Sequence, residues 1–516
     1  MVTETFTVEV DISGEGDYGG TYDDITDDVI KMSWQIGLAK PYDIIARDST
    51  AEIYVKNASK KYSPAYSSSP IYGGLVRGKH VRIKSTYGAT TTTWFVGFIL
   101  SIEPMAGAYM DRQTRIVCEG WFSLAQRITC KIPIQLNKTA DEVIQTILEE
   151  TSIKPPVLLQ SWVLGVSTLE ETTKLGAISD YYSGYSGVLN LGVSGDWSSN
   201  TSVYGAVSEV TGREGGGRFI QTREGTLEFW DRYYFIRQRP SAETFTNSFV
   251  ELNYKYGDMY NSITVPYNTK TIGTTPEVLS INNDVTKIEA GATANVTFRY
   301  IDSDTGLAIS GSTVSKPVQT TDYTGNTAED GSGTDVTGYV TAELFEEYGN
   351  SAVIQYTNSY SATVWIQAGA QIKGIKIVNI GGMEYTVQDV ASIASIGVIP
   401  YVYPYQLENL ETAQYLASYI LNKRTNTTGI VESLSYYTNT SATLMQATHD
   451  ICIGERITVA ETQTAINSEY HVVGEKHDVL QGKGIHLVSF ILEPADETNY
   501  WILDTSALEY ETIIGP

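Results

Sequence analysis

The chain has 516 residues, 42% of them hydrophobic and 18% charged, so it holds enough apolar material for packed cores and is not globally disordered. Its 60 acidic and 35 basic residues give a net charge of −25, which argues against binding to nucleic-acid phosphates or to an anionic membrane. A chain of this length predicts three or four domains.

The sequence carries no sign of export or of membrane insertion. Its three cysteines, Cys118, Cys130 and Cys452, form no CxxC motif and are too few for a disulfide framework. The N-terminal stretch lacks the basic and apolar regions of a signal peptide, and no apolar run approaches the ~20 residues that span a bilayer. We therefore expect assembly in the cytosol without membrane insertion.

Residues 1–135 are expected to form a β-domain. Three runs are rich in β-branched and aromatic residues, at 51–57, 80–85 and 92–100. In the second run Val81 and Ile83 alternate with charged residues, which is the period of a half-buried strand. The Ser-, Pro-, Gly- and Tyr-rich stretch 60–78 predicts a loop.

Residues 136–268 predict a smaller α+β domain. The first expected helix lies within 136–152, where Thr139 and Glu142 have the spacing of a capping box. A second helix is expected at Val203–Val210, whose apolar residues follow the helical period. A hairpin follows, with strands at Arg218–Gln221 and Thr226–Phe229 around a turn at 223–225. The Gly-, Ser- and Tyr-rich stretch 175–200 predicts a loop.

Residues 269–372 look like an insertion. Short strand patterns recur there between turn signals, and no cysteine pair is present. This spacing predicts a small β-sandwich of immunoglobulin type without a disulfide.

Residues 373–516 contain strand patterns like those of residues 1–135, and they predict a second β-domain with a tail. A helix is expected at Asn409–Arg424, which has one apolar face and basic residues in its last turn. Strands are expected at 454–460, 470–479 and 484–494, the last two forming a hairpin around two glycines. The fold class is therefore mainly β with minor α.

Three of the five histidines, His471, His477 and His486, cluster near this last hairpin. His471 and His477 are an even number of residues apart and can share a strand face. His486 can approach them across the turn, so a metal site is one interpretation. HxH and HExxH motifs and nearby cysteines are absent, so we favour exposed hairpin histidines instead.

Other motifs that suggest chemistry have structural explanations. Cys118 lies in an apparent strand and is expected to be a core thiol. Gly14–Gly19 matches GxGxxG but has no βαβ unit around it, and Gly212–Gly217 follows a helix, so both predict turns. Asp302–Gly306 resembles half of a calcium loop without its bidentate Glu. We assign no catalytic, cofactor-binding or metal-binding residue and expect no enzymatic activity and no cofactor.

Four groups of segments, in their order along the chain, resemble the phage tail hub or tail-tip proteins related to the baseplate hub. They are Tyr22–Asp43 with Ala51–Gly88 and Trp94–Pro104; Ser202–Arg232; Gly257–Val265; and the C-terminal series 411–421, 453–459, 470–479 and 484–494, ending in Trp501–Pro516. The first group includes the "YSP" loop and the "YGGL", "GKHVRI" and "GFI" segments. Together they cover the chain apart from roughly 275–372.

The resemblance implies a structural protein of the virion tail. It implies a homotrimer that caps the tail tube, because hubs are usually trimers and tube rings are sixfold. Two similar β-barrel domains, 1–135 and 373–516 with strands from 233–268, would give six modules from three chains. Expected partners are distal tail or tube ring proteins and tip fibre or spike proteins. DNA would pass through an acidic lumen at ejection without specific binding.

Two other functions stay open at this point. A carbohydrate-binding receptor or adhesin is suggested by the abundant aromatic residues and by the inserted domain, which would contact host surface glycans. A distal tail ring protein is the other alternative.

Overall fold

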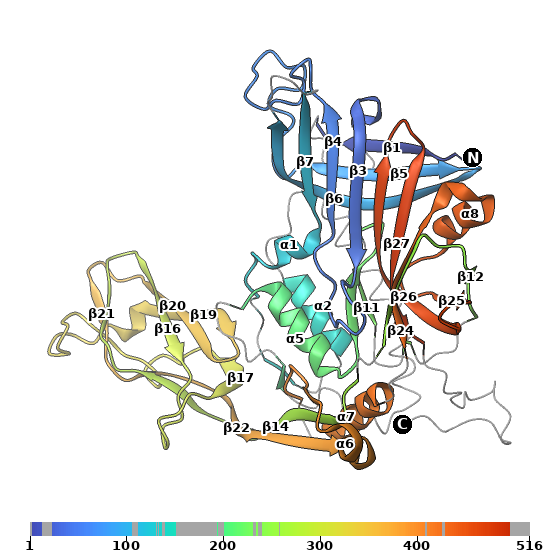
Figure 1. Ribbon diagram of the computed structural model, residues 1–516. Helices are drawn as coiled ribbons and strands as arrows, with labels where there is room; N and C mark the ends of the chain where they lie inside the picture. Colours follow the sequence, from blue (N-terminus) through green and yellow to red (C-terminus); the bar gives the residue numbers. More distant parts are fainter. Residues whose placement is uncertain are drawn as a thin grey trace.

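The computed structural model is mainly β and contains several sheets (Figure 1). It describes residues 3–12, 23–105, 112–130, 132, 134–136, 140–150, 193–194, 201–225, 227–230, 234–235, 240–256, 259–407, 410–425 and 429–495. Within these ranges, no helix is both long and apolar enough to cross a lipid bilayer.

The strands of the N-terminal segment curve around one hydrophobic core. They are β1 (Thr5–Val10), β2 (Asp23–Asp24), β3 (Val29–Gly37), β4 (Thr50–Lys56), β5 (His80–Tyr87), β6 (Thr90–Met105) and β7 (Gln113–Glu119), with the 3-10 helix η1 (Thr26–Asp28). Alternate residues point inward, as Ala51, Ile53 and Val55 do in β4. They meet Trp34 and Trp94 in one core. The predicted strands contribute to it, and so do β1 and β3, which were not predicted from the sequence.

The C-terminal strands enclose a second core. They are β24 (Ile430–Tyr437), β25 (Arg456–Glu461), β26 (Ile466–Leu480) and β27 (Ile485–Pro494), covered by α8 (Ala442–Asp450) after η5 (Thr438–Thr440). Two strands from the middle of the chain join them: β12 (Thr244–Thr246) beside β25 and β13 (Glu251–Lys255) beside β24. Phe245, Tyr436 and Phe490 lie at the centre of this core.

The two sets of strands form one continuous sheet of 13 strands, which joins the two ends of the chain. The joint is β26: its first half pairs with β25 and its second half pairs with β3, from Gly474 opposite Gly37 to Leu480 opposite Lys31. A bulge at Val472/Gly474 separates the two halves where β26 pairs with β27. The division at residues 135 and 373 stays a prediction, since the sheet runs through both segments.

The middle segment packs beneath the joint. It contains α1 (Trp121–Ala125), α2 (Ala140–Glu150), α5 (Val203–Arg213), the hairpin β10 (Arg218–Gln221) and β11 (Leu227–Trp230), and the short pair β8 (Gln135–Leu136) and β9 (Val193–Ser194). The helices α2 and α5 and the hairpin agree with the sequence prediction, whereas α1 was not predicted. Helix α2 buries the expected apolar face against α5. Apart from β9, the predicted loop 175–200 lies outside the described residues.

A long two-stranded ribbon leaves the middle segment and carries a separate small β-unit. The ribbon consists of β14 (Ser262–Asn282) and β22 (Ala370–Gln388), paired in antiparallel register. At one end its strands continue into β15 (Thr286–Ile288), β16 (Thr293–Arg299), β17 (Ser310–Ser315), β18 (Gly325–Asn326), η4 (Thr337–Tyr339), β19 (Val340–Tyr348), β20 (Ser351–Asn358) and β21 (Val364–Ile366). Two three-stranded sheets, β15-β21-β18 and β16-β20-β19, enclose a core of their own. The immunoglobulin type of this sandwich stays a prediction.

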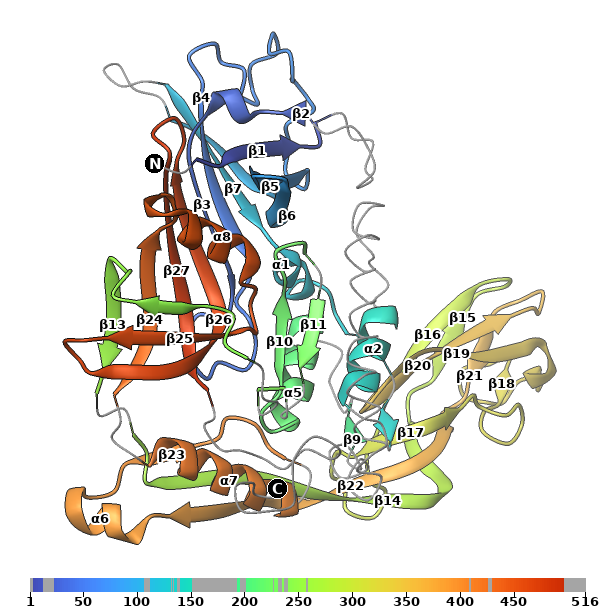
Figure 2. The same cartoon turned by 90° about the vertical axis from the view of Figure 1, so that its right-hand side faces the viewer.

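The other end of the ribbon lies far from the sandwich (Figure 2). It carries α6 (Val390–Ile396), the edge strand β23 (Pro400–Val402) and α7 (Leu410–Arg424). The predicted helix at 409–424 is therefore present in its described part, and its apolar face covers the ribbon through Ala413, Leu416 and Ala417.

Candidate functional site

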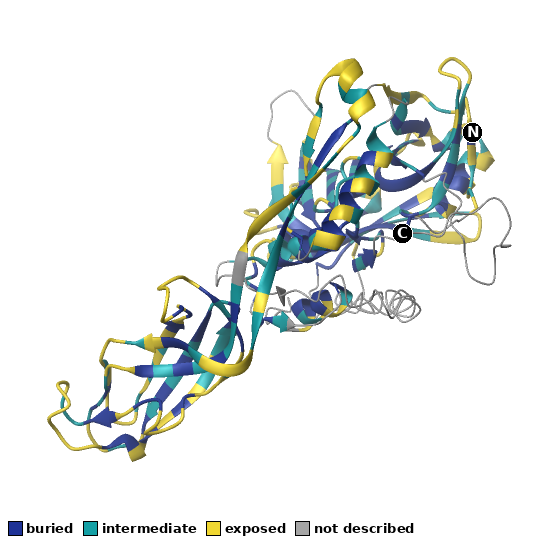
Figure 3. Cartoon of the chain, turned by 90° about the horizontal axis from the view of Figure 1, so that it is seen from below, coloured by how far each residue is buried: buried dark blue, intermediate teal, exposed yellow. Residues whose placement is uncertain are grey.

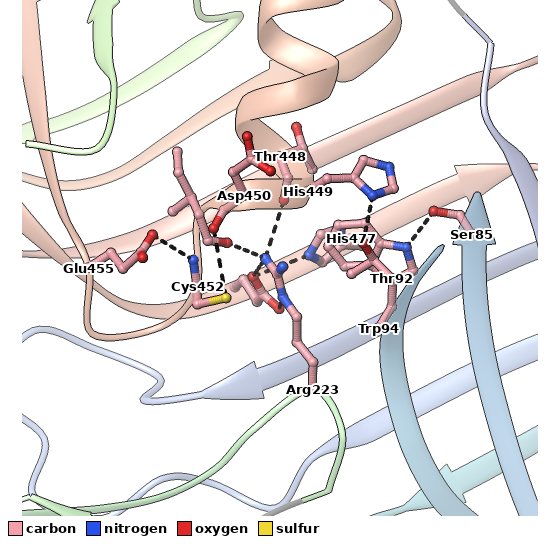
Figure 4. A network of polar contacts seen from close by, with 12 residues as sticks. Ser85, Thr92, Trp94, Arg223, Thr448, His449, Asp450, Cys452, Glu455 and His477 are labelled. Atoms are coloured by element: carbon pink, nitrogen blue, oxygen red, sulfur yellow. Dashed lines mark hydrogen bonds and ion pairs between the residues drawn. The ribbon is translucent and has the colours of Figure 1, made fainter. Parts of the chain in front are cut away.

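A network of charged and polar side chains is buried where the two halves of the sheet meet the middle hairpin. Figure 4 shows the part of it around Arg223, His449 and His477. Its residues come from segments far apart in the sequence: Glu4 before β1, Arg223 in the β10–β11 turn, His449 in α8, Glu475 and His477 in β26, and His486 in β27. Burial makes each of these groups costly unless it has partners, so the network fixes how the segments fit together.

The Arg223–Glu475 ion pair is the centre of the network. The guanidinium donates from Nε to Glu475 Oε1 and from Nη2 to Oε2, both at 2.6 Å, and from Nη2 to the Ile451 carbonyl at 2.7 Å. Its plane lies over the Trp94 ring at 4.4 Å. Burial alone would raise the pKa of the Glu475 carboxyl, but the charge of Arg223 lowers it to about 2.

A chain of imidazoles links this pair to the N-terminal segment. His477 Nε2 lies 3.6 Å from Glu475 Oε2, and His477 Nδ1 lies 2.9 Å from His486 Nε2. His486 Nδ1 then contacts Glu4 Oε1 at 2.5 Å. The His477 ring stacks on Trp34 with centroids 4.7 Å apart, which fixes its orientation.

Glu4 connects the N-terminal strands of the sheet to the C-terminal elements. Its Oε2 accepts from Ser85 Oγ at 2.8 Å and lies 3.3 Å from His449 Nε2, while His449 Nδ1 lies 2.7 Å from Thr92 Oγ1. Burial would raise the pKa of the Glu4 carboxyl, but hydrogen bonds with His449 and His486 lower it to about 2. The carboxylate is therefore ionised in its buried position.

The prediction that the hairpin histidines are exposed was wrong. His471, His477 and His486 are all buried, because β26 and β27 run between the two cores rather than along a solvated edge. Only His477 and His486 come together. His471 lies beyond the bulge and packs on Phe235, with ring centroids 4.6 Å apart. Over the described ranges, no set of three His, Cys, Asp or Glu side chains is arranged to hold a metal ion.

A second buried ion pair ties the hairpin to β27. Arg218 Nη2 lies 3.3 Å from Glu493 Oε1, and the backbone N–H of Tyr42 donates to Glu493 Oε2 at 2.9 Å. Burial opposes the ionised form, but Arg218 keeps the pKa of Glu493 below its usual value. The short hairpin therefore holds β26 through Arg223 and β27 through Arg218.

The remaining motifs have structural roles where the structure describes them. Cys118 is buried in β7, and burial raises the pKa of its thiol. Asp302 holds the turn at 302–306 by accepting from the Asp304 N–H at 2.8 Å, and it pairs with Lys376 Nζ at 2.7 Å. Gly215 follows α5 with φ of 74°, as a residue after a helix end often does. The motif Gly14–Gly19 lies outside the described residues.

Sequence reasoning did not find Glu4, Arg223 or Glu475. Arg223 lies in a polar turn and Glu475 in a strand with charged neighbours, so both look like ordinary exposed residues. Glu475 is buried in β26 opposite β3, and Arg223 is buried against Glu475 and the Trp94 ring, so both depend on long-range contacts. The resulting arrangement holds segments together, because its acids and imidazoles are engaged with one another.

No family model and no curated protein matches the sequence. Phage tail proteins are among the solved structures that the chain resembles. A tail protein from Neisseria meningitidis has a TM-score of 0.46 at 8% identity, over 95% of this chain and 96% of that one. The 43 kDa tail protein of prophage MuSo2 from Shewanella oneidensis has a TM-score of 0.44 at 8% identity, over 94% and 97%. Prophage tail protein gp18 from Listeria monocytogenes has a TM-score of 0.36 at 9% identity, over 94% of each chain.

Proposed function

We propose that the chain is a structural, non-enzymatic component of a phage tail tip, a trimeric hub that caps the tail tube. The observation that carries this proposal is the single sheet with two cores, one from each end of the chain. One chain then offers two β-modules side by side, and three chains offer six. Such a ring adapts a sixfold tube to a threefold tip.

In this proposal residues 1–135 and 373–516 are the two barrel domains, 136–268 is the middle domain and 269–372 is the insert. The buried Arg223–Glu475 and Arg218–Glu493 pairs support the proposal, because they lock the middle hairpin against the strands of the joint. A rigid joint keeps the two modules in one spatial relation, which matching a sixfold ring requires. The partners are tube or distal ring proteins on one side and fibre or spike proteins on the other.

The charge of the chain fits a path for DNA. With a net charge of −25, a lumen built from three copies repels phosphate groups, so DNA slides past without sticking. In this proposal the protein is part of the virion tail and is assembled in the host cytoplasm.

Light scattering on the purified chain tests the proposal. Three chains of 56.7 kDa predict a particle of about 170 kDa. A hexamer would instead favour a distal tail ring, and a particle that stays monomeric at all concentrations would contradict the hub.

A second function, binding of host surface glycans, is favoured by one feature of the insert. Tyr339 is exposed and lies beside Tyr360, with ring centroids 5.0 Å apart, which gives a small aromatic surface for a sugar ring. Glycan-array binding by the full chain, lost in Tyr339→Ala and kept in the matched exposed variant Phe345→Ala, would support it. Equal signals from all three proteins, or none from the parent, would contradict it.

A further inference from the structure

The end of the ribbon opposite the sandwich presents an exposed apolar surface, called here the tip surface. It consists of Val390, Ile396, Val398 and Val402, of which Val390 is 76% and Val402 60% exposed. None of the residues of α6 is buried. Exposed residues are visible at this end of the ribbon from below (Figure 3). Exposed apolar patches are typical of interaction sites.

The tip surface is held in one shape by Asn261. This buried side chain donates from Nδ2 to the Gly397 carbonyl at 2.8 Å and to Ser392 Oγ at 3.1 Å, and its Oδ1 accepts from the Ile399 N–H at 2.7 Å. Asp389 caps α6 through the N–H groups of Ala391 and Ser392. A surface ordered in advance loses little conformational entropy when it binds.

The charge pattern indicates what kind of partner fits. No acidic or basic residue occurs from Val390 to Leu407, in a chain whose charged fraction is 18%. Copies of a chain with net charge −25 repel one another over most of their surface. Two copies can approach each other where one presents this uncharged stretch, because it adds no like-charge repulsion. Desolvating this stretch leaves no unpaired charge behind.

A matching surface exists elsewhere on the same chain. Strand β13 ends the 13-stranded sheet, so its outer edge pairs with no other strand of the described part of the chain. Val250, just before it, is 61% exposed, and most residues of the strand are exposed. Strand β23 at the tip is likewise the last strand of its sheet. Two open strand edges, each with exposed apolar side chains, can associate through backbone hydrogen bonds and apolar contact.

We propose that the tip surface of one copy docks on the β13 edge of the next copy, head to tail, and that this contact closes the ring. The inference rests on the proposed trimer and names the surfaces that build it. Strand β13 and α6 lie on one side of the molecule, and the sandwich projects from the other (Figure 2). Copies can therefore meet through these surfaces while the inserts stay outside the contact.

The test uses three matched variants of the full chain, each adding two carboxylates at exposed positions. The tip variant is Val390→Asp with Val398→Asp, the edge variant is Val250→Asp with Asn253→Asp, and the control on the insert is Leu307→Asp with Val318→Asp. Circular dichroism and thermal unfolding confirm that each is folded. We expect the parent and the control at about 170 kDa, and the tip and edge variants alone at the 56.7 kDa of one chain.

Mixing the tip and edge variants tests the pairing itself. Each mixed pair retains one intact contact, so the mixture should form a heterodimer of about 113 kDa that neither variant forms alone. A mixture that stays monomeric overturns the head-to-tail pairing. Tip variants that keep the trimer mass also overturn it, while leaving the proposed hub intact. If these trimers lose a binding to phosphatidylcholine vesicles that the parent shows, the tip surface serves a membrane. A parent that is itself monomeric overturns the hub and the inference together.

Discussion

At the residue scale, the buried ion pair Arg223–Glu475 is a geometric lock rather than a large source of stability. Desolvating two charges costs about as much as their attraction returns, so such pairs are kept where they specify a geometry. Here the bidentate contact aligns the hairpin turn with β26. The guanidinium of Arg223 also lies over the Trp94 ring and donates a hydrogen bond to the Ile451 carbonyl.

Removing one partner of this pair is expected to destabilise the protein strongly. Arg223→Ala leaves Glu475 charged and buried, and the free energy of unfolding should fall by about 3–5 kcal/mol. The double variant Arg223→Met with Glu475→Leu should lose less than either single change. Urea unfolding followed by circular dichroism measures both. The matched control is Glu343→Ala, which breaks an exposed pair with Lys316 and should change the free energy by about 0–1 kcal/mol. Equal losses in the control and in Arg223→Ala would contradict this assignment.

The buried histidines make stability depend on pH. Burial lowers the pKa values of His80, His471 and His477 to about 4. Each imidazole is therefore neutral in the folded state while the unfolded chain takes up a proton below about pH 6.5. Their contribution is complete above about pH 6.5 and is lost as the pH falls toward 4. The Glu4 and Glu475 contribution is lost only below about pH 4.5 and down to about 2, in the same direction.

Replacing one histidine tests this dependence. His471 packs on Phe235, so His471→Phe fits an apolar environment and removes one proton taken up on unfolding. The slope of unfolding free energy against pH between 4 and 6.5 should fall by up to about 1.4 kcal/mol per pH unit. Urea unfolding at several pH values measures it. An unchanged slope would show that His471 titrates alike in the folded and unfolded states.

At the scale of elements, local sequence patterns predicted individual helices and the hairpin. They did not predict the joint between the two halves of the sheet. The apolar period and capping residues placed α2, α5 and α7, and the turn glycine placed the β10–β11 hairpin. The pairing of β3 with β26 joins residues more than 400 positions apart, and no local pattern encodes it. The exposure of His477 depends on that pairing, which is why the sequence predicted it wrongly.

The joint itself depends on a glycine. A Cβ on Gly474 would lie 2.2 Å from the backbone oxygen of Leu38, so only glycine permits the close approach of β26 to the end of β3. Gly474→Ala should therefore loosen the joint, with faster amide hydrogen exchange in residues 31–38 and a loss of about 2 kcal/mol or more. Gly338→Ala is the control, because a Cβ there meets nothing within 4 Å. Slow exchange retained in β3 would contradict this role.

At the scale of the whole molecule, the ribbon separates the insert from the parts proposed to assemble. The sandwich has its own core, and the ribbon strands are paired opposite each other at Ile272/Ile377 and at Glu277/Gly374. Replacing residues 278–373 by an Asn-Gly turn should therefore leave the sheet and both of its cores folded, since the ribbon closes as a hairpin.

If the tip surface and the β13 edge build the ring, light scattering should give three times the mass of the shortened chain. A shortened chain that is folded but monomeric would place the ring contact in the insert. Glycan binding, if the parent has it, should disappear in the same protein because Tyr339 and Tyr360 are removed.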